Sequence, residues 1–278
     1  MDDVVTTEWL ASALGADDLT VLDASMFMAA MGRDGAAEFA AAHIPGARFL
    51  DVDAISDKAH PAPHMLPPPA QFGAAMEALG VDRTDRIVIY DNSPLRSSAR
   101  GWFMLRHFGA ERVAILDGGF GKWLAEGRPV ESGEPAPRKG ARFEATDRAD
   151  VVDKAALLAG VEDALVDARP RPRFEGSDPD PRPGVGTGHI PGARNLPLGE
   201  LYNPDGTFKA PDQLRAAFAA AGVDPAAPFV ASCGSGVTAN SLIVAARLAG
   251  GGDKARLYDG SWSEWGADPA TPKALGPA

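Results

Sequence analysis

The chain has 278 residues with a formal net charge of −11, and 45% of them are hydrophobic, which is typical of a globular protein with a substantial core. A non-specific nucleic-acid binder would normally be basic, and an acidic surface is repelled by anionic membranes, so neither partner is expected. The histidines and the one cysteine lack metal-ligand spacing, so we expect no metal site. The N-terminus is acidic, unlike a signal peptide, and no apolar run approaches the roughly 18 residues of a membrane span. A lone cysteine forms no internal disulfide, so we expect a protein of the reducing cytoplasm.

Along the chain, short apolar runs alternate with helical patterns. The run R-I-V-I-Y is too short for a typical helix and is rich in β-branched residues, which predicts a buried strand. The segment after it carries apolar residues at helical spacing and ends at Gly109. We predict strands at residues 86–90, 113–116 and 228–232, and helices at 98–108 and 239–248. This alternation indicates an α/β fold with a mainly parallel sheet flanked by helices.

The order of elements repeats within the chain. The hexapeptide H-I-P-G-A-R begins at His43 and again at His189, and other landmarks recur at nearly the same separation, about 142 to 146 residues. These landmarks are V-L-D-A at 21–24 with L-V-D-A at 165–168, I-V-I-Y-D at 87–91 with F-V-A-S-C at 229–233, and L-D-G-G at 116–119 with Y-D-G-S at 258–261. We therefore predict two tandem domains, residues 1–135 and 151–278, joined by a polar linker at 136–150.

The only cysteine begins the segment C-G-S-G-V-T-A, residues 233–239, directly after a predicted strand. Ligands of open α/β sheets bind beyond the carboxyl ends of the strands. Small residues after Cys233 allow a tight turn with inward-pointing N–H groups, and the following helix adds the positive end of its dipole. Both favour an anion, so we interpret Cys233 as a thiolate nucleophile. The alternative is the buried, inert cysteine that is common in protein cores.

Two other cysteine chemistries fit this loop less well. A cysteine protease would need a nearby histidine base and an acyl substrate. A cysteine-based phosphatase would need an arginine to clamp phosphate at the position of Ala239.

The loop resembles the active-site loop of the 3-mercaptopyruvate sulfurtransferases, a family of tandem rhodanese-domain proteins. Thiosulfate-preferring rhodaneses usually have C-R-K-G-V-T-A there, with two cations where this chain has Gly234 and Ser235. The resemblance covers almost the whole chain, through H-I-P-G-A in both halves, R-F-E-G-S-D-P-D-P-R at 173–182 and D-G-S-W-S-E-W at 259–265. It implies two rhodanese-like α/β domains. The first would be catalytically inactive, because Asp91 stands where the second has Cys233.

The resemblance also implies a reaction. The Cys233 thiolate would take sulfur from 3-mercaptopyruvate and release pyruvate. The resulting persulfide would pass its outer sulfur to thioredoxin, another thiol or cyanide, with no cofactor. Arg173 and Arg182 match the family's substrate-binding arginines, and the arginine fork suits the substrate carboxylate. The loop would supply the other substrate-binding residues, Gly234, Gly236, Val237 and Thr238.

Proton transfer in this family is attributed to a Ser–His–Asp arrangement. The matching residues are Ser235, His64 and Asp53, where the imidazole has a suitable pKa for proton transfer and the carboxylate would orient the ring. Asp51 and Asp57 are neighbouring alternatives for the carboxylate. The arrangement would draw two members from the first half of the chain and one from the second.

Two other functions stay open. A thiosulfate:cyanide sulfurtransferase would use the same persulfide with a dianionic donor. A non-enzymatic persulfide carrier would keep Cys233 but would need no carboxylate-binding arginines.

Other conspicuous residues receive structural interpretations. His43 and His189 occur in both halves, although only one half has the cysteine, so we expect both to order the H-I-P-G turn. Residues 169–188 are rich in proline and predict a surface loop. Thr238 could line the pocket or cap the following helix. We expect solvated side chains at Arg169, Arg171 and Arg194. We expect core or domain-packing positions for Trp102, Trp123, Trp262 and Trp265.

Overall fold

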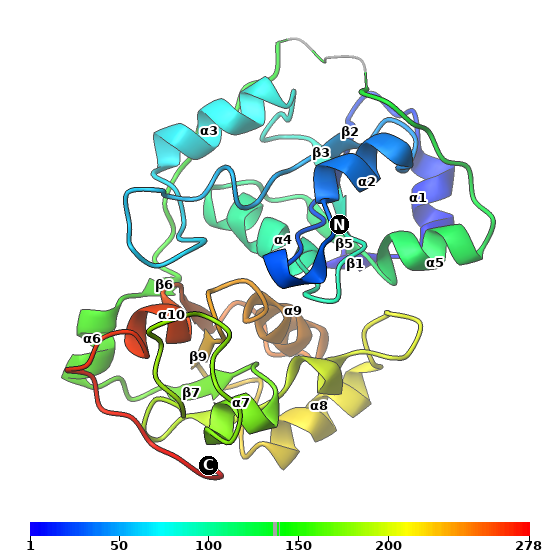
Figure 1. Ribbon diagram of the computed structural model, residues 1–278. Helices are drawn as coiled ribbons and strands as arrows, with labels where there is room; N and C mark the ends of the chain where they lie inside the picture. Colours follow the sequence, from blue (N-terminus) through cyan, green and yellow to red (C-terminus); the bar gives the residue numbers. More distant parts are fainter. Residues whose placement is uncertain (136–137, 139) are drawn as a thin grey trace. The chain divides into compact units, whose positions relative to one another are not determined.

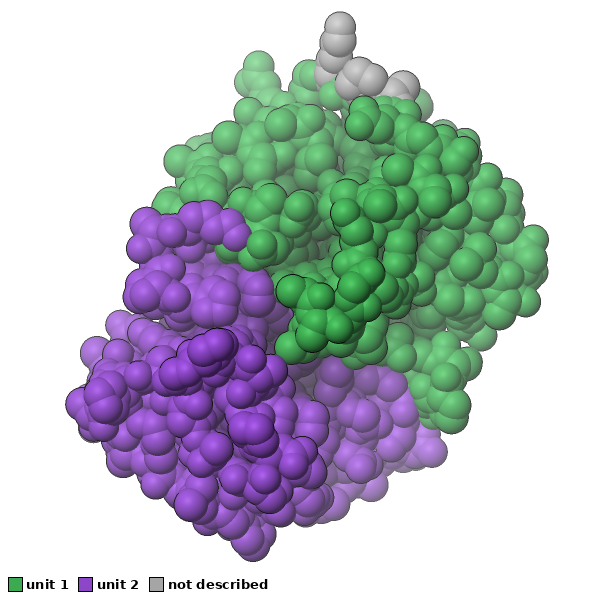
Figure 2. All heavy atoms as spheres, viewed as in Figure 1, with its two compact units in different colours: residues 1–56, 67–148, 203–208 green, residues 57–66, 149–202, 209–278 purple. Residues whose placement is uncertain are grey.

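The computed structural model describes residues 1–135, 138 and 140–278. The chain divides into two compact units, which Figure 2 shows in different colours. Unit 1 comprises residues 1–56, 67–148 and 203–208, and unit 2 comprises residues 57–66, 149–202 and 209–278. Each unit therefore includes a short segment from the other half of the chain. We call residues 57–66 the first arm and residues 203–208 the second arm.

Unit 1 is built on a five-stranded parallel sheet with the order β1-β5-β4-β2-β3, and Figure 1 shows the helices that flank it. Its strands are β1 (Val4–Val5), β2 (Leu19–Asp23), β3 (Arg48–Phe49), β4 (Arg86–Tyr90) and β5 (Val113–Leu116). Its helices are α1 (Thr7–Ala13), α2 (Gly35–Ala41), α3 (Pro69–Ala78), α4 (Ser98–His107) and α5 (Gly119–Ala125). Helix α4 packs on β4 and β5 and is buried along most of its length.

Unit 2 repeats this plan, with the strand order β6-β10-β9-β7-β8 and all neighbours parallel. Its strands are β6 (Val151–Val152), β7 (Ala164–Asp167), β8 (Arg194–Asn195), β9 (Phe229–Ser232) and β10 (Ala255–Tyr258). Its helices are α6 (Lys154–Ala159), α7 (Arg171–Glu175), α8 (Pro211–Ala220), α9 (Asn240–Leu248) and α10 (Ser261–Trp265). The predicted α/β class, with parallel sheets flanked by helices, is confirmed.

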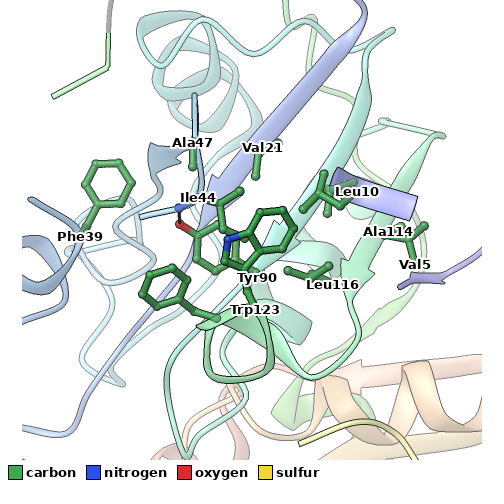
Figure 3. Packing of buried hydrophobic residues seen from close by; sticks show 12 residues of the cluster. Val5, Leu10, Val21, Phe39, Ile44, Ala47, Tyr90, Ala114, Leu116 and Trp123 are labelled. Atoms are coloured by element: carbon green, nitrogen blue, oxygen red, sulfur yellow. Dashed lines mark hydrogen bonds between the residues drawn. The ribbon is translucent and has the colours of Figure 1, made fainter. Parts of the chain in front are cut away.

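The core of unit 1 explains why its central strands read as apolar runs. β4 is covered on both faces, so its residues from Ile87 to Tyr90 are all buried. Figure 3 shows Tyr90 and Trp123 close to Ile44, and the Tyr90 hydroxyl accepts a hydrogen bond from the Ile44 N–H at 3.2 Å. Burying each large apolar side chain contributes about 1.5–3 kcal/mol. The four tryptophans predicted to lie in the core, at positions 102, 123, 262 and 265, are all buried, as expected.

In the segment predicted as a linker, residues 136–150, positions 136, 137 and 139 lie outside the described residues. Arg138 forms an ion pair with the buried carboxylate of Asp85. Phe143 is also buried, and its ring packs edge-on against Phe72 with 5.5 Å between centroids. The described part of this polar segment up to Arg148 therefore belongs to unit 1.

The prediction of a surface loop at residues 169–188 is wrong near its start, where the chain forms a short helix. Helix α7 begins at Arg171, with Pro170 at its N-cap and Pro172 in its first turn, where the N–H that proline lacks has no partner within the helix. The helix ends at Gly176, which adopts a left-handed conformation with φ of 85°. Within the described ranges of the chain, no helix is long and apolar enough to cross a lipid bilayer.

Candidate active site

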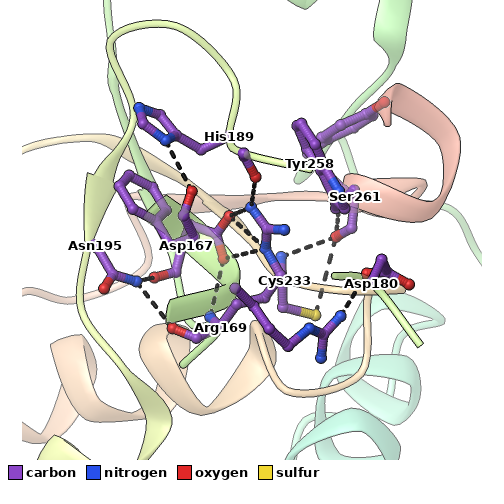
Figure 4. Close-up of polar contacts among 12 residues, drawn as sticks. Asp167, Arg169, Asp180, His189, Asn195, Cys233, Tyr258 and Ser261 are labelled. Carbon is purple, nitrogen blue, oxygen red and sulfur yellow. Dashed lines mark hydrogen bonds and ion pairs between the residues drawn. The ribbon is translucent and has the colours of Figure 1, made fainter. Parts of the chain in front are cut away.

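The cysteine lies in unit 2, at the first position beyond the carboxyl end of β9. Strands β7 and β10 flank β9 on its two sides, so Cys233 occupies the middle of the sheet edge. Its N–H donates to the Ser261 hydroxyl at 3.1 Å, and the same oxygen lies 4.0 Å from the Cys233 sulfur (Figure 4). The residue is only 1% exposed. The sulfur is thus held in a fixed place by the sheet and by the start of α10.

Two glycines shape the loop after the cysteine. Gly236 has φ of 72°, and a side chain there would lie 2.4 Å from the backbone oxygen of Asp259. A side chain at Gly234 would lie 3.2 Å from a guanidinium nitrogen of Arg182 and 3.6 Å from one of Arg173. The small residues therefore allow the loop to turn sharply and allow two arginines to approach the position beside the cysteine.

The two arginines share one buried acid. Arg173 Nη2 donates to Asp180 Oδ2 at 2.5 Å, and Arg182 Nη1 donates to Asp180 Oδ1 at 3.1 Å. The Asp180 side chain is 1% exposed, whereas those of Arg173 and Arg182 are 21% and 26% exposed. The carboxylate therefore fixes both cations at the loop and neutralises one of their two charges. Charge-assisted bonds of this kind are the strongest hydrogen bonds available to side chains.

The structure places His64 and Ser235 together. His64 lies in the first arm, which belongs to unit 2, and its Nδ1 is 2.9 Å from the Ser235 hydroxyl oxygen. A proton on either atom satisfies this bond, so the pair can pass a proton in either direction. Asp53 belongs to unit 1, where its backbone oxygen accepts bonds from the Ser56 N–H and hydroxyl. The orienting role of Asp53 stays a prediction.

The rest of the loop is fixed by the first residue of α9. The Asn240 side-chain amide is fully buried and donates to the backbone oxygens of Gly236 at 2.6 Å and Val237 at 2.9 Å. Val237 is itself buried, and the Thr238 oxygen accepts the Ser241 N–H at 3.2 Å. Helix α9 begins after Ala239, which supplies no side-chain cap. Asn240 engages the carbonyls of the turn and so holds the backbone of the loop in its curved form.

A scan against protein-family models matches the rhodanese-like domain twice, at residues 6–126 and 151–268. The chain belongs to the rhodanese-like domain family. It is 41% identical to the 3-mercaptopyruvate sulfurtransferase of Escherichia coli K12 over 268 residues, which cover 95% of this chain and 94% of that protein. It is also 40% identical to the thiosulfate sulfurtransferase of Bos taurus over 273 residues, which cover 94% and 91%.

A solved structure agrees with this assignment. The crystal structure of SseA from Escherichia coli, described as showing the rhodanese fold and catalytic mechanism of 3-mercaptopyruvate sulfotransferases, superimposes with a TM-score of 0.85. That alignment has 37% sequence identity and covers 95% of this chain and all of SseA. The expected tandem pair of rhodanese-like domains is therefore confirmed.

The first rhodanese-like domain has a carboxylate where the second has its sulfur. Asp91 Oδ1 accepts the Ser93 N–H and Asp91 Oδ2 accepts the Ser98 N–H, both at 2.8 Å. The side chain thus occupies the N–H groups of its own loop and the start of α4. The N–H groups of this loop therefore bind a carboxylate, and that carboxylate is the side chain of Asp91 itself.

The expectation of a solvated Arg169 is wrong, because this residue is 2% exposed. Its guanidinium pairs with the Asp167 carboxylate at 2.8 Å and donates to the Gly188 oxygen at 2.8 Å (Figure 4). It also lies 4.5 Å from the ring centre of Trp262. A buried charge needs such partners. Arg171 and Arg194 are exposed, as expected.

The two repeated histidines make the same contacts in both domains. His43 stacks on Phe39 at 4.1 Å and its Nδ1 lies 2.8 Å from the Phe39 oxygen. His189 stacks on Phe174 at 3.9 Å and its Nδ1 lies 2.9 Å from the Phe174 oxygen. Each ring thus joins the H-I-P-G turn to a neighbouring helix, which agrees with the structural interpretation.

Sequence reasoning missed four residues that shape the site: Asp180, Asn240, Asp259 and Ser261. Asp180 and Asp259 lie inside motifs that pointed to the family, so their position was visible but their contacts were not. Among the residues that the structure describes, no cluster of histidine, cysteine and acidic side chains could hold a metal ion.

Proposed function

We propose that this protein is a sulfurtransferase that takes sulfur from 3-mercaptopyruvate, releases pyruvate, and passes the sulfur to a thiol or cyanide through a Cys233 persulfide. The observation that carries the proposal is the placement of two guanidinium groups over Gly234, directly beside the cysteine. Two arginine forks suit the carboxylate and keto oxygens of a 2-oxo acid. The relatives named as 3-mercaptopyruvate sulfurtransferases support the same substrate.

The chemistry proceeds in two displacements. The Cys233 thiolate attacks the donor sulfur, a sulfur–sulfur bond forms, the carbon–sulfur bond breaks, and the electron pair leaves as the enolate of pyruvate. A proton delivered to the enolate completes pyruvate. An acceptor thiolate or cyanide then attacks the outer sulfur, and the electron pair of the broken bond returns to Cys233.

His64 and Ser235 are the proposed proton carriers. Their 2.9 Å contact joins an imidazole, which gains and loses protons near neutral pH, to a hydroxyl two residues from the sulfur. Asp53 is proposed to orient the imidazole. Gly234, Gly236, Val237 and Thr238 are proposed to contact the donor and the persulfide with their backbone.

Acceptor and location are further parts of the proposal. Thioredoxin, another thiol or cyanide suits a persulfide in a rigid loop, since only the outer sulfur must be reached. The cytoplasm is proposed because a single thiol with no disulfide fits a reducing compartment. One relative from Arabidopsis thaliana is named as mitochondrial.

Thiosulfate is the second candidate donor, because the bovine relative is named thiosulfate sulfurtransferase and two relatives from Arabidopsis thaliana carry both donors in their names. Thiosulfate is a dianion, however, and positions 234 and 235 supply no cation to balance its second charge. We therefore propose 3-mercaptopyruvate as the preferred donor.

Initial rates with each donor, with cyanide as acceptor, test the proposal in the wild type and in Cys233→Ser. We expect faster turnover of 3-mercaptopyruvate and no turnover in the variant. A preference for thiosulfate would reverse the donor assignment and keep the persulfide. Full activity in Cys233→Ser would refute the covalent mechanism, and no turnover of either donor by the wild type would favour a persulfide carrier.

A further inference from the structure

The first arm is held where it carries His64. The Leu66 N–H donates to Asp259 Oδ2 at 2.6 Å, and the Asp57 N–H donates to the Met65 oxygen at 2.9 Å. These two bonds fix the residues that directly follow the histidine. Asp259 is 3% exposed and directly follows β10, so the bond ties the arm to the sheet edge that carries the cysteine.

His64 itself adopts a backbone conformation that its side chain disfavours. Its φ is 63°, in the left-handed region that is uncommon for residues other than glycine. Such a conformation costs about 1–3 kcal/mol and persists only where surrounding contacts impose it. The bonds at Met65 and Leu66 are contacts of this kind.

The same bond occurs in unit 1 without a histidine. The Phe208 N–H of the second arm donates to Asp117 Oδ1 at 2.8 Å, and Phe208 and Asp117 occupy the repeat positions of Leu66 and Asp259. At the repeat position of His64 the second arm has Gly206, with φ of 85°. Both arms therefore have a left-handed residue at this position, and only in the first arm is that residue a histidine.

Asp259 also contacts the cysteine loop. A side chain at Gly236 would lie 2.4 Å from the Asp259 backbone oxygen and 2.8 Å from its Oδ1. One carboxylate oxygen thus faces the loop that carries Ser235, and the other accepts the bond from the arm that carries His64. The Asp259 side chain therefore contacts both the arm that carries His64 and the loop that carries Ser235.

We propose that Asp259 is a positioning residue that couples the first arm to the cysteine loop and thereby holds His64 against Ser235. The inference rests on the proposed sulfur transfer, in which His64 handles protons. We expect Asp259 to act through geometry, because its Oδ2 accepts the Leu66 N–H. An uncharged acceptor of the same shape should therefore serve equally well.

The test compares Asp259→Ala, Asp259→Asn and Asp117→Ala by steady-state turnover of 3-mercaptopyruvate. Asp259→Ala should lower kcat about tenfold, because a small misplacement of a catalytic group is costly, and should leave KM within about twofold because the arginines are untouched. Asp259→Asn retains the acceptor and should stay within about threefold of wild-type kcat. Asp117→Ala removes the matching bond in unit 1 and should leave kcat within about twofold.

A double-mutant cycle with His64→Ala shows whether Asp259 acts through the histidine. In that background Asp259→Ala should lower the rate of persulfide formation, followed by mass spectrometry in a single turnover, by less than about twofold. A tenfold loss that persists there, or an equal loss in Asp259→Asn, would overturn the proposal. If Asp259→Ala does not fold, the Asp259→Asn result still decides between geometry and charge. A wild type inactive with 3-mercaptopyruvate would instead refute the proposed function.

Discussion

Replacing the acid between the two arginines should change which sulfur donor the protein prefers. Asp180 accepts bonds from Arg173 at 2.5 Å and from Arg182 at 3.1 Å, so the three side chains together carry one positive charge. That charge matches the single carboxylate of 3-mercaptopyruvate. Asp180→Asn keeps one acceptor oxygen and raises the charge of the trio to two, which matches the dianion thiosulfate.

The size of the effect follows from the exposure of the arginines. Two unit charges about 4 Å apart interact by about 1 kcal/mol in water and by about 4 kcal/mol at an effective dielectric constant of 20. Both arginine side chains are about a quarter exposed, at 21% and 26%, so a value near the lower end applies. The second negative charge of thiosulfate should then gain about 1.4 kcal/mol, which is about tenfold in relative kcat/KM.

The assay is the ratio of kcat/KM for thiosulfate to that for 3-mercaptopyruvate, with cyanide as the common acceptor. Asp178→Asn is the matched control, because Asp178 is an exposed acid two residues away on the same segment. We expect the ratio to rise in Asp180→Asn alone. If kcat/KM for both donors falls by the same factor, Asp180 only supports the fold and the charge argument is refuted.

Three further predictions concern stability. His64→Gly should be more stable than His64→Ala by about 1 kcal/mol, because φ at this position is positive and glycine tolerates a positive φ better than alanine does. Urea unfolding in which the alanine variant is equally stable or more stable would contradict this. Burial raises the pKa of Asp23 to about 6. Between about pH 4 and pH 6 the folded state therefore holds a proton that the unfolded state has released. The free energy of unfolding falls by about 3 kcal/mol as pH rises through this range. Asp23→Asn should therefore raise the free energy of unfolding near pH 7.5 but not near pH 4, and an equal gain at both would refute the assignment. Arg169→Met should cost about 3–5 kcal/mol, because it leaves the Asp167 carboxylate buried without its partner; a loss in thermal unfolding below about 1 kcal/mol would contradict it.

The sheet and its repetition could be predicted from the sequence because they depend on local pattern. Strand β4 was predicted with its observed bounds, since a strand covered on both faces must be continuously apolar. Cys233 was placed at the carboxyl end of a strand by the same reasoning. The pairing of His64 with Ser235, by contrast, came only from the family resemblance, because 171 residues separate them and no periodicity links such distant positions.

The supporting acids could not be predicted, for a different reason. The chain has 38 acidic residues, and most acids in proteins are solvated, so composition does not distinguish Asp180 or Asp259 from the rest. Arg169 was misread because its partner is only two residues away, at a bend where the Asp167 carboxylate also accepts the Arg169 N–H at 2.9 Å. Only the folded backbone shows that the Arg169 guanidinium turns back to the Asp167 carboxylate.

The reciprocal arms determine when during synthesis each unit can be completed. Unit 1 includes residues 203–208, so its last segment leaves the ribosome only after about half of unit 2 has been made. Unit 2 includes residues 57–66, which emerge early and must wait for β9 and β10 before Leu66 can reach Asp259. Domains usually fold one after the other during translation. Here neither half can finish alone, and a cut at the repeat boundary would separate the histidine from its cysteine. The sulfur site therefore forms last, when the nearly complete chain is available.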